Sequence, residues 1–249
     1  MTLYSSKRRQ VLAAGMLLAG LPPAAQAMHG SLRIVTSNLP PLSIEQGGEQ
    51  PGALLEIVQV LCKRLRVTPQ LDFLPWKRAI FVTSTATRTA IFPLTRQADR
   101  EAKFRWLAQL YEENYIFLAP KGGSFDVRRP AEMKNRRIAM IRGGAQSMVL
   151  KELGYVRVVE ASSVNEVHRF LLEGMADAAI GERAIINSSL RTRKSEQQFV
   201  VSEPVHKTAA WLAGSLDFSE TEAAMFARTM KGIVADGTRL KILQKYGLA

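Results

Sequence analysis

Short apolar runs alternate with longer amphipathic segments along most of the chain. SLRIVTS (31–37) alternates apolar and polar residues and is rich in β-branched side chains, which indicates a strand. Residues 51–66 repeat apolar positions at helical spacing, and PQLDFLP (69–75) is again typical of a strand. This opening, continued by residues 76–84 and 87–94, predicts an α/β sheet with right-handed crossovers.

The same alternation starts again in the middle of the chain. NYIFLAP (114–120) is typical of a strand, and residues 121–135 contain the Gly, Pro and polar residues expected at a boundary between units. Beyond it the pattern predicts a strand over 136–141, a turn and helix over 142–154, a strand over 155–161, a helix over 163–174 and a strand over 176–181. The chain is therefore expected to contain two α/β units.

The last fifty residues indicate how the two units are joined. Residues 199–214 are extended and β-prone, and two helical segments follow over 219–237 and 238–247. If 114–120 and 207–213 are both strands between the units, the final helices return to the first unit. The second unit is then an insertion into the first.

The N-terminal segment is expected to be a secretory signal. Its first ten residues contain the basic residues Lys7, Arg8 and Arg9. Residues 11–21 are apolar, and AAQA (24–27) ends in an Ala-x-Ala pattern. A membrane-spanning helix needs about 20 apolar residues, so a membrane-embedded anchor is less favoured. The sequence predicts cleavage after Ala27 and a periplasmic protein, while the Arg8-Arg9 pair leaves open the choice between the general and the twin-Arg export routes.

Charge and composition exclude several classes of function. Removal of residues 1–27, which contain three basic and no acidic residues, lowers the formal net charge from +12 to +9. Cys62 is the only cysteine and falls on an apolar helical stripe, so we expect a buried thiol and no internal disulfide. The three His residues lack partners at metal-ligand spacing, and the RGGAQ turn lacks the spacing of a nucleotide site, so neither a metal nor a cofactor is expected.

One charged segment, LTRQADREAKFRW (94–106), is a candidate for chemistry. It is too short and too poor in interleaved aromatics for a nucleic-acid site. It directly follows an apolar strand, and open α/β sheets bind ligands at the carboxyl ends of their strands. A guanidinium fixed there could make two parallel hydrogen bonds to a carboxylate, and Arg100 is the candidate. The alternative is a solvated charged surface.

The order of these motifs resembles the periplasmic solute-binding proteins of the polar amino-acid class, which serve ABC importers. The chain has SNLPPLS, then PWKRAI after the second strand, LTRQADRE, and Trp106 six residues after Arg100. In the second half it has RGGAQ at a helix start, GMADAA with Asp177, and Glu182 five positions later. The resemblance implies a periplasmic-binding-protein type II fold, in which two α/β lobes are joined by two hinge strands.

The resemblance also implies a ligand site. Arg100 would bind an α-carboxylate, Thr95 would add a hydroxyl beside it, and Glu182, where the family usually has Asp, would bind the ammonium group. The backbone amides of the turn would close on the carboxylate from the second lobe; they belong to Gly144, Ala145 and Gln146. Three further residues are expected in the cleft wall, namely Asn38, Trp76 and Arg78.

The function implied is capture of a small carboxylated solute, an amino acid or related organic acid, by a monomeric receptor that delivers it to an ABC permease. The expected organisation is a signal peptide (1–27), a discontinuous first lobe (28–117 and 208–249) and an inserted second lobe (118–207). Two alternatives stay open: a dehydratase-like exported enzyme on the same fold, and a ligand-sensing module. A cleft carboxyl group or His with a pKa near 7 would favour the enzyme, and the candidates are Glu182, Glu203 and His206.

Overall fold

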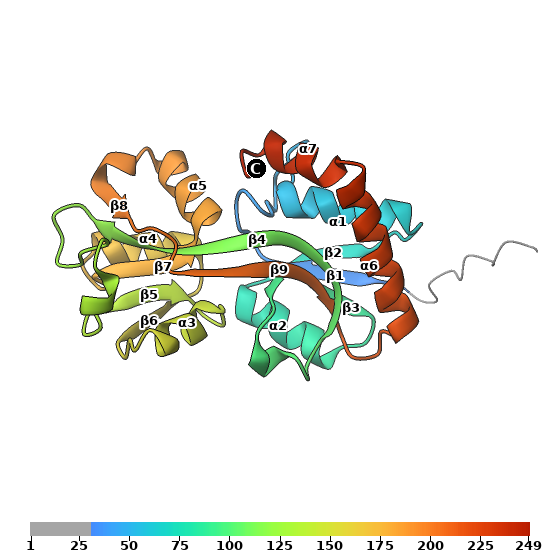
Figure 1. Ribbon diagram of the computed structural model, residues 1–249, viewed down its shortest axis with the longest axis horizontal. Coiled ribbons are helices and arrows are strands. Elements are labelled where there is room, and N and C mark those ends of the chain that lie inside the picture. Colours follow the sequence, from blue (N-terminus) through green and yellow to red (C-terminus); the bar gives the residue numbers. More distant parts are fainter. Residues whose placement is uncertain (1–30) are drawn as a thin grey trace, which may run out of the picture.

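The computed structural model describes residues 31–249, so the expected signal segment lies outside the described residues (Figure 1). The chain forms two α/β lobes side by side. Two long strands run through both of them, β4 (Arg105–Pro120) and β9 (His206–Gly214). The predicted two-lobed α/β architecture with two connecting strands is confirmed.

The first lobe is built around the strand order β2-β1-β3-β9-β4. Strands β1, β2 and β3 are mutually parallel, whereas β9 runs antiparallel to both β3 and β4. The remaining elements of this lobe are β1 (Arg33–Thr36), α1 (Ala53–Arg64), β2 (Gln70–Phe73), α2 (Trp76–Thr85), β3 (Thr89–Thr95), a 3-10 turn at Ala98–Arg100, α6 (Glu220–Ala235) and α7 (Thr238–Lys245).

The second lobe continues the sheet in the order β4-β7-β5-β6, with β8 also paired to the end of β4. Its strands β5, β6 and β7 are parallel to one another, and β7 is antiparallel to β4. Its elements are β5 (Ile138–Ile141), α3 (Gln146–Glu152), β6 (Val158–Ala161), α4 (Val164–Leu172), β7 (Ala178–Glu182), α5 (Arg183–Arg193) and β8 (Phe199–Val201), with 3-10 turns at Pro130–Glu132 and Glu196–Gln198.

Helical periodicity explains how the first lobe is packed. The apolar stripe of α1, which includes Leu54, Leu61 and Cys62, is buried in one core together with Phe226 of α6 and Leu243 of α7. The C-terminal helices therefore cover the same face of the sheet as α1 (Figure 1). The predicted buried thiol is confirmed, and burial raises the pKa of Cys62 to about 11.

The chain passes between the lobes inside β4. The pattern predicted a strand over 114–120, but the strand begins at Arg105, because the residues before 114 also pair with β9. Side chains up to Tyr111 pack in the first core, and those from Tyr115 onwards pack in cores of the second lobe. We propose that the chain passes from one lobe to the other within or beside β4 and β9. The boundaries expected from the sequence, 117/118 and 207/208, fall in these two strands.

Two parts of the second lobe differ from the sequence-based expectation. Residues 121–135, expected at a boundary, contribute Phe125 to the second core, where its ring lies 5.1 Å from that of Phe117. Helix α5 was not predicted, because few of its residues are apolar. Its buried face consists of Ala184, Ile186 and Leu190.

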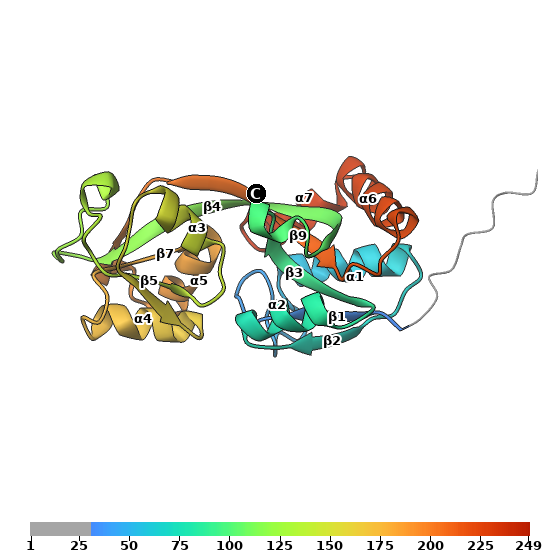
Figure 2. The ribbon, with the colours of Figure 1, turned by 90° about the horizontal axis from the view of Figure 1, so that it is seen from below.

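The lobes are joined along one side by β4 and β9 (Figure 2). They also meet across the cleft, where Ile141, Val164 and Ile185 of the second lobe pack against a first-lobe cluster that includes Leu39 and Trp76. Within residues 31–249, no helix is both long and apolar enough to cross a membrane. The cleft between the lobes is where residues distant in sequence come together.

Candidate functional site

A small cavity lies between the lobes, next to the crossing strands. Its volume is about 40 Å³, and we call it the inner cavity. The residues that line it come from the β1 loop, α2, β3, β4, the RGGAQ turn and the start of α5: Leu39, Trp76, Pro93, Thr95, Glu113, Tyr115, Ile141, Gly144, Ala145, Gln146, Glu182 and Ile185. Both lobes therefore contribute to one site.

Glu113 is the central acid of the inner cavity. It is 5% exposed, and its Oε2 accepts a hydrogen bond of 2.8 Å from the Thr95 hydroxyl. The Tyr115 hydroxyl lies 2.8 Å from the Thr95 oxygen and donates to the same carboxyl oxygen at 3.4 Å. Burial raises the pKa of Glu113 to about 8, although both hydroxyl hydrogen bonds lower it.

Glu182 is a second buried acid and comes from the other lobe. It is 2% exposed and caps the start of α5, where its Oε2 accepts hydrogen bonds from the amides of Ala184 (2.7 Å) and Ile185 (3.1 Å). Its Oε1 has no hydrogen-bond partner among residues 31–249. The Asn114 amide and the Tyr111 hydroxyl are close enough to lower its pKa, but neither meets hydrogen-bond geometry with Oε1.

Burial outweighs these hydrogen bonds at Glu182. The pKa of its carboxyl group is raised to about 7, and the charges of Glu113 and Glu182 raise one another's cost of ionisation. At neutral pH Glu113 is therefore mostly protonated, whereas Glu182 lies close to its midpoint. A ligand that favours one protonation state will shift both.

The RGGAQ turn forms the floor of the inner cavity on the second-lobe side. Gly143 adopts φ +77°, a conformation that favours Gly, and a Cβ built on Gly144 would lie 2.0 Å from Oε1 of Gln146. That oxygen of Gln146 is buried and has no partner. The helix that follows, α3, has only seven residues, so the turn offers a weak dipole for an anion.

Arg100 lies beside the cavity but not in its wall. It is 6% exposed, its Nη1 donates to the Thr95 carbonyl at 2.9 Å, and its Nη2 donates to the Gly143 carbonyl at 2.9 Å. The second bond crosses from the first lobe to the second. Burial lowers the pKa of the guanidinium, which stays protonated because arginine does not lose its proton in proteins.

The other expected wall residues are divided between separate hollows. Trp76 lines the inner cavity and is largely buried, whereas Asn38 lines a wider hollow of about 460 Å³ at its mouth, which we call the vestibule. Ser162 and Ser163 line the vestibule from the second lobe. Arg78 is exposed and lines a third hollow on the outer side of Trp76.

The fold is shared with solved structures of amino-acid-binding proteins. An ancestral arginine-binding protein bound to glutamine matches with a TM-score of 0.78 at 15% identity, over 89% of this chain and 100% of that chain. An ABC uptake transporter substrate-binding protein from Streptococcus pneumoniae with bound histidine matches with a TM-score of 0.76 at 15% identity, over 87% and 92%. The GluR0 ligand-binding core from Nostoc punctiforme in complex with L-glutamate matches at 0.74 and 12%, over 88% and 100%.

The chain has the type II periplasmic-binding-protein fold. The fold implied by the resemblance to the polar amino-acid class is confirmed, and these neighbours were solved with bound arginine, histidine, glutamine or glutamate. No protein-family model matches the sequence, and no curated protein does either. At identities this low the likeness establishes the type II fold, and the site has to be argued from the chain's own residues.

The charged segment 94–106 of this type II protein is mostly a surface structure. Arg96 forms a bidentate pair with exposed Glu101 at 2.8 and 2.9 Å and stacks over the rings of Trp106 and Trp211, each at 5.2 Å. Of the four basic side chains in this segment, Arg100 is the one that is buried. The solvated surface interpretation fits Arg96 and Glu101, while the role of Arg100 in carboxylate binding stays a prediction.

Sequence reasoning missed Glu113 and Tyr115. A signal for them is present, because three consecutive polar residues, Glu112 to Asn114, interrupt the otherwise apolar run of β4. Such an interruption in a buried strand indicates a polar site rather than a core. Among residues 31–249, no three or more His, Cys, Asp or Glu side chains are grouped as metal ligands.

Proposed function

We propose that this protein is a periplasmic solute-binding protein, which closes its lobes over a small polar solute and delivers it to an ABC permease. The observation that carries the proposal is that the inner cavity between the lobes is lined by Glu182 and Gln146, each of which has a buried oxygen without a hydrogen-bond partner among residues 31–249. Each unpaired buried polar group costs about 1–3 kcal/mol. A ligand that donates hydrogen bonds to them recovers that cost.

Closure follows from the connection between the lobes. The strands β4 and β9 join the lobes on one side, so rotation about them opens the cleft on the other (Figure 2). A ligand that contacts both lobes selects the closed form, and closure excludes water and strengthens the polar contacts. The match to an ABC uptake transporter substrate-binding protein supports the permease as partner.

The carboxylated solute expected from the sequence requires Arg100 to change partners. Its two Nη groups already donate to backbone carbonyls, and a carboxylate would have to displace at least the Gly143 carbonyl. Acids and amino acids are therefore kept among the compounds to be tested for binding. It is not the only chemistry that the cleft supports.

A second candidate function is acid–base catalysis by the same cleft. Glu182 has a pKa raised to about 7 and Glu113 one raised to about 8, which is the range that a general acid or base needs at neutral pH. An enzyme would consume a candidate substrate in the presence of catalytic amounts of protein. Stoichiometric binding without turnover would count against the enzyme.

A thermal-shift screen of the chain from residue 28 onwards tests solute binding. The panel comprises amino acids, organic acids, small anions and organic amines, because a ligand at 100 times its dissociation constant adds about 2.7 kcal/mol of stability. We expect hits confined to small polar compounds. A folded protein that responds to none of the panel would contradict the proposal.

Export and oligomeric state have separate tests. N-terminal sequencing of protein recovered from the periplasm is expected to begin at Met28, the residue after the proposed cleavage site. Size-exclusion chromatography with light scattering is expected to give a monomer. Recovery of the uncleaved chain from the cytoplasm would contradict a periplasmic role.

A further inference from the structure

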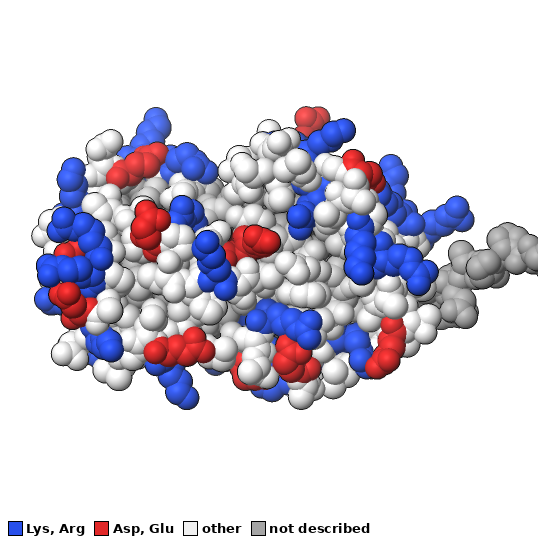
Figure 3. All heavy atoms as spheres, viewed as in Figure 1, with Lys and Arg blue, Asp and Glu red and all other residues white. Residues whose placement is uncertain are grey.

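The cleft is acidic although the protein is basic. The chain carries 34 Lys and Arg against 22 Asp and Glu, and blue side chains are spread over both lobes in Figure 3. Yet among the described residues, the charged side chains that line the inner cavity and the vestibule are Glu45, Glu113 and Glu182, with no Lys or Arg. The charge of the cleft is opposite to that of the surface.

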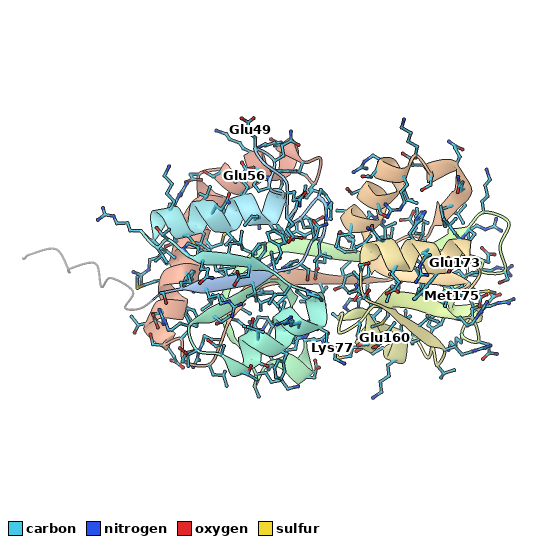
Figure 4. All side chains as sticks on the ribbon, turned by 180° about the vertical axis from the view of Figure 1, so that it is seen from behind. Glu49, Glu56, Lys77, Glu160, Glu173 and Met175 are labelled. Carbon is cyan, nitrogen blue, oxygen red and sulfur yellow. The ribbon has the colours of Figure 1, made fainter. Side chains whose placement is uncertain are left out.

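Apart from Arg100, which lies beside the inner cavity, other basic side chains line the third hollow. Lys77, Arg78 and Arg142 are found there, on the outer side of Trp76, and Arg142 pairs with Glu160 at 3.1 Å. Figure 4 shows Lys77 and Glu160 at the facing edges of the two lobes. Among the described residues, the inner cavity and this hollow share only Trp76 in their linings.

The inner cavity presents hydrogen-bond acceptors. Oε1 of Glu182 and Oε1 of Gln146 are buried without partners, and the hydrogen bonds found for Glu113 within residues 31–249 all use its Oε2. Three residues from both lobes that carry acceptor oxygens therefore line one cavity. A primary ammonium carries three N–H donors and no acceptor, and an amidinium or guanidinium is likewise a pure donor.

Arg100, the buried cation beside the site in the described part of the chain, already has hydrogen-bond partners. Arg100 donates to two backbone carbonyls and does not line the cavity. Among the described residues, no Lys or Arg lines the cavity to pair with a carboxylate, and a carboxylate there would oppose the ionisation of Glu182 and Glu113. The cavity therefore disfavours an anion.

The sizes of the inner cavity and the vestibule suit a ligand with a small charged head group and a longer tail. A cavity of about 40 Å³ has room for roughly three water-sized groups, since one water needs about 10–15 Å³. That suits a cationic head group, with the apolar side chains of Leu39, Trp76 and Pro93 around it. The vestibule shares Leu39, Trp76 and Ile141 with the inner cavity, so it has room for the rest of the ligand.

We infer that the ligand is a small organic amine, whose cationic head is held by Glu113, Glu182 and Gln146 and which needs no carboxylate. This inference rests on the proposed solute-binding function and specifies its ligand class. The indole of Trp76 packs against the chain of the amine or stacks with its charge. Arg100 positions the second lobe rather than touching the ligand.

Proton linkage distinguishes an amine from an acid. The charged and titratable groups around Glu113 and Glu182 are Arg100, Tyr111, Tyr115 and Arg183, with His206 stacked 6.0 Å from the Tyr115 ring. A bound cation favours the ionised carboxylates, so its binding releases protons and its affinity rises from about pH 6 to about pH 8.5. A bound anion favours the protonated acids, and its affinity falls over the same interval.

Decarboxylated pairs make the comparison direct. Calorimetric titrations use agmatine against arginine, histamine against histidine and cadaverine against lysine, in buffers of different ionisation enthalpy. In at least one pair the amine is expected to bind tenfold or more tightly than the amino acid, with proton release. An amino acid that binds while its amine does not, or an affinity that falls as the pH rises, overturns the inference.

Matched variants locate the head group. Glu113→Gln and Glu182→Gln keep the hydrogen bonds to Thr95 and to the α5 amides but remove the charge, and each is expected to weaken amine binding at least tenfold. Glu112→Gln changes the exposed neighbour of Glu113 and is expected to have no effect. If the Gln variants stay folded by circular dichroism and still bind the amine at full strength, the inference is wrong.

The two proposals fail in different ways. If no compound of the full panel binds, solute binding itself is contradicted and the amine with it. If acids or zwitterions bind and amines do not, only the ligand class is overturned.

Discussion

Nη2 of Arg100 donates a hydrogen bond of 2.9 Å to the carbonyl of Gly143, on the opposite lobe. Nη1 of the same side chain holds the carbonyl of Thr95 at 2.9 Å, so one guanidinium joins the end of β3 to the turn after β5. The planar fork of arginine suits two acceptors at a fixed separation, which a single ammonium does not reproduce. Arg100 thus stabilises lobe closure without a bound anion.

Replacement of Arg100 tests this role. Arg100→Lys is expected to shift the free protein towards an open form, because the ammonium cannot hold both carbonyls, and to weaken all ligands by a similar factor of about ten (about 1.4 kcal/mol). Small-angle scattering and calorimetry measure the two effects. Arg96→Lys, in the exposed pair with Glu101, serves as a control with an effect below about 1 kcal/mol. A loss confined to carboxylated ligands would instead show that Arg100 binds a carboxylate.

The buried acids make the stability of the free protein depend on pH. Since the pKa of Glu113 rises from 4.5 to about 8 on folding, its folded form holds a proton that the unfolded chain has lost. Its contribution to the free energy of unfolding therefore falls as the pH rises from about 5 to about 8, by roughly 1 kcal/mol or more. Denaturant unfolding at several pH values measures this.

The matched variant isolates that contribution from other titrations. The pKa of His168 is lowered by burial, and this group has the opposite effect, since its unfolded form gains the proton near pH 6.5. Glu113→Gln keeps acceptors for Thr95 and Tyr115, so its stability is expected to fall less than that of the wild type as the pH rises. Parallel pH profiles for the two proteins would refute the buried, protonated state of Glu113.

The RGGAQ turn is expected to tolerate no side chain at Gly144. A Cβ there would lie 2.0 Å from Gln146 Oε1 and 2.9 Å from the Ile141 carbonyl, so the turn or the Gln146 side chain must move. Gly144→Ala is expected to lower stability by about 1–3 kcal/mol and to weaken ligand binding. Gly232→Ala, within α6 and with open space around it, is expected to be neutral or stabilising. Equal melting temperatures for both variants would contradict this geometry.

A capping box fixes the start of α6. The hydroxyl of Ser219 accepts from the Glu222 amide at 3.1 Å, and the Glu222 carboxylate accepts from the Ser219 amide at 2.9 Å. Ser219→Ala is expected to lower the free energy of unfolding by about 1 kcal/mol. Ligand affinity is expected to stay unchanged, since Ser219 lies outside the cleft. A change in affinity without a change in stability would be inconsistent with a purely structural cap.

The sequence by itself determined the order of the elements and the fold class. Apolar periods of about 3.6 and 2 residues specify helices and strands locally, and the same periods bury α1 and the C-terminal helices against the sheet. The extended segments 114–120 and 199–214 indicated that the chain returns to the first lobe, because strands of this kind need partners. Apolar periodicity and extended segments depend on residues that are close in sequence, so they can be recognised before the tertiary structure is known.

The partners of the site residues were decided by tertiary structure. Arg100 and Gly143 are 43 residues apart, and Glu113 and Glu182 come from different strands, so no local pattern pairs them. The sequence indicated a guanidinium at a strand end, but only folding shows that backbone carbonyls occupy it. The pKa values of the two acids likewise arise from burial by residues of both lobes. Burial and pairing are properties of the assembled cleft, so they cannot be predicted from residues that are neighbours in the chain.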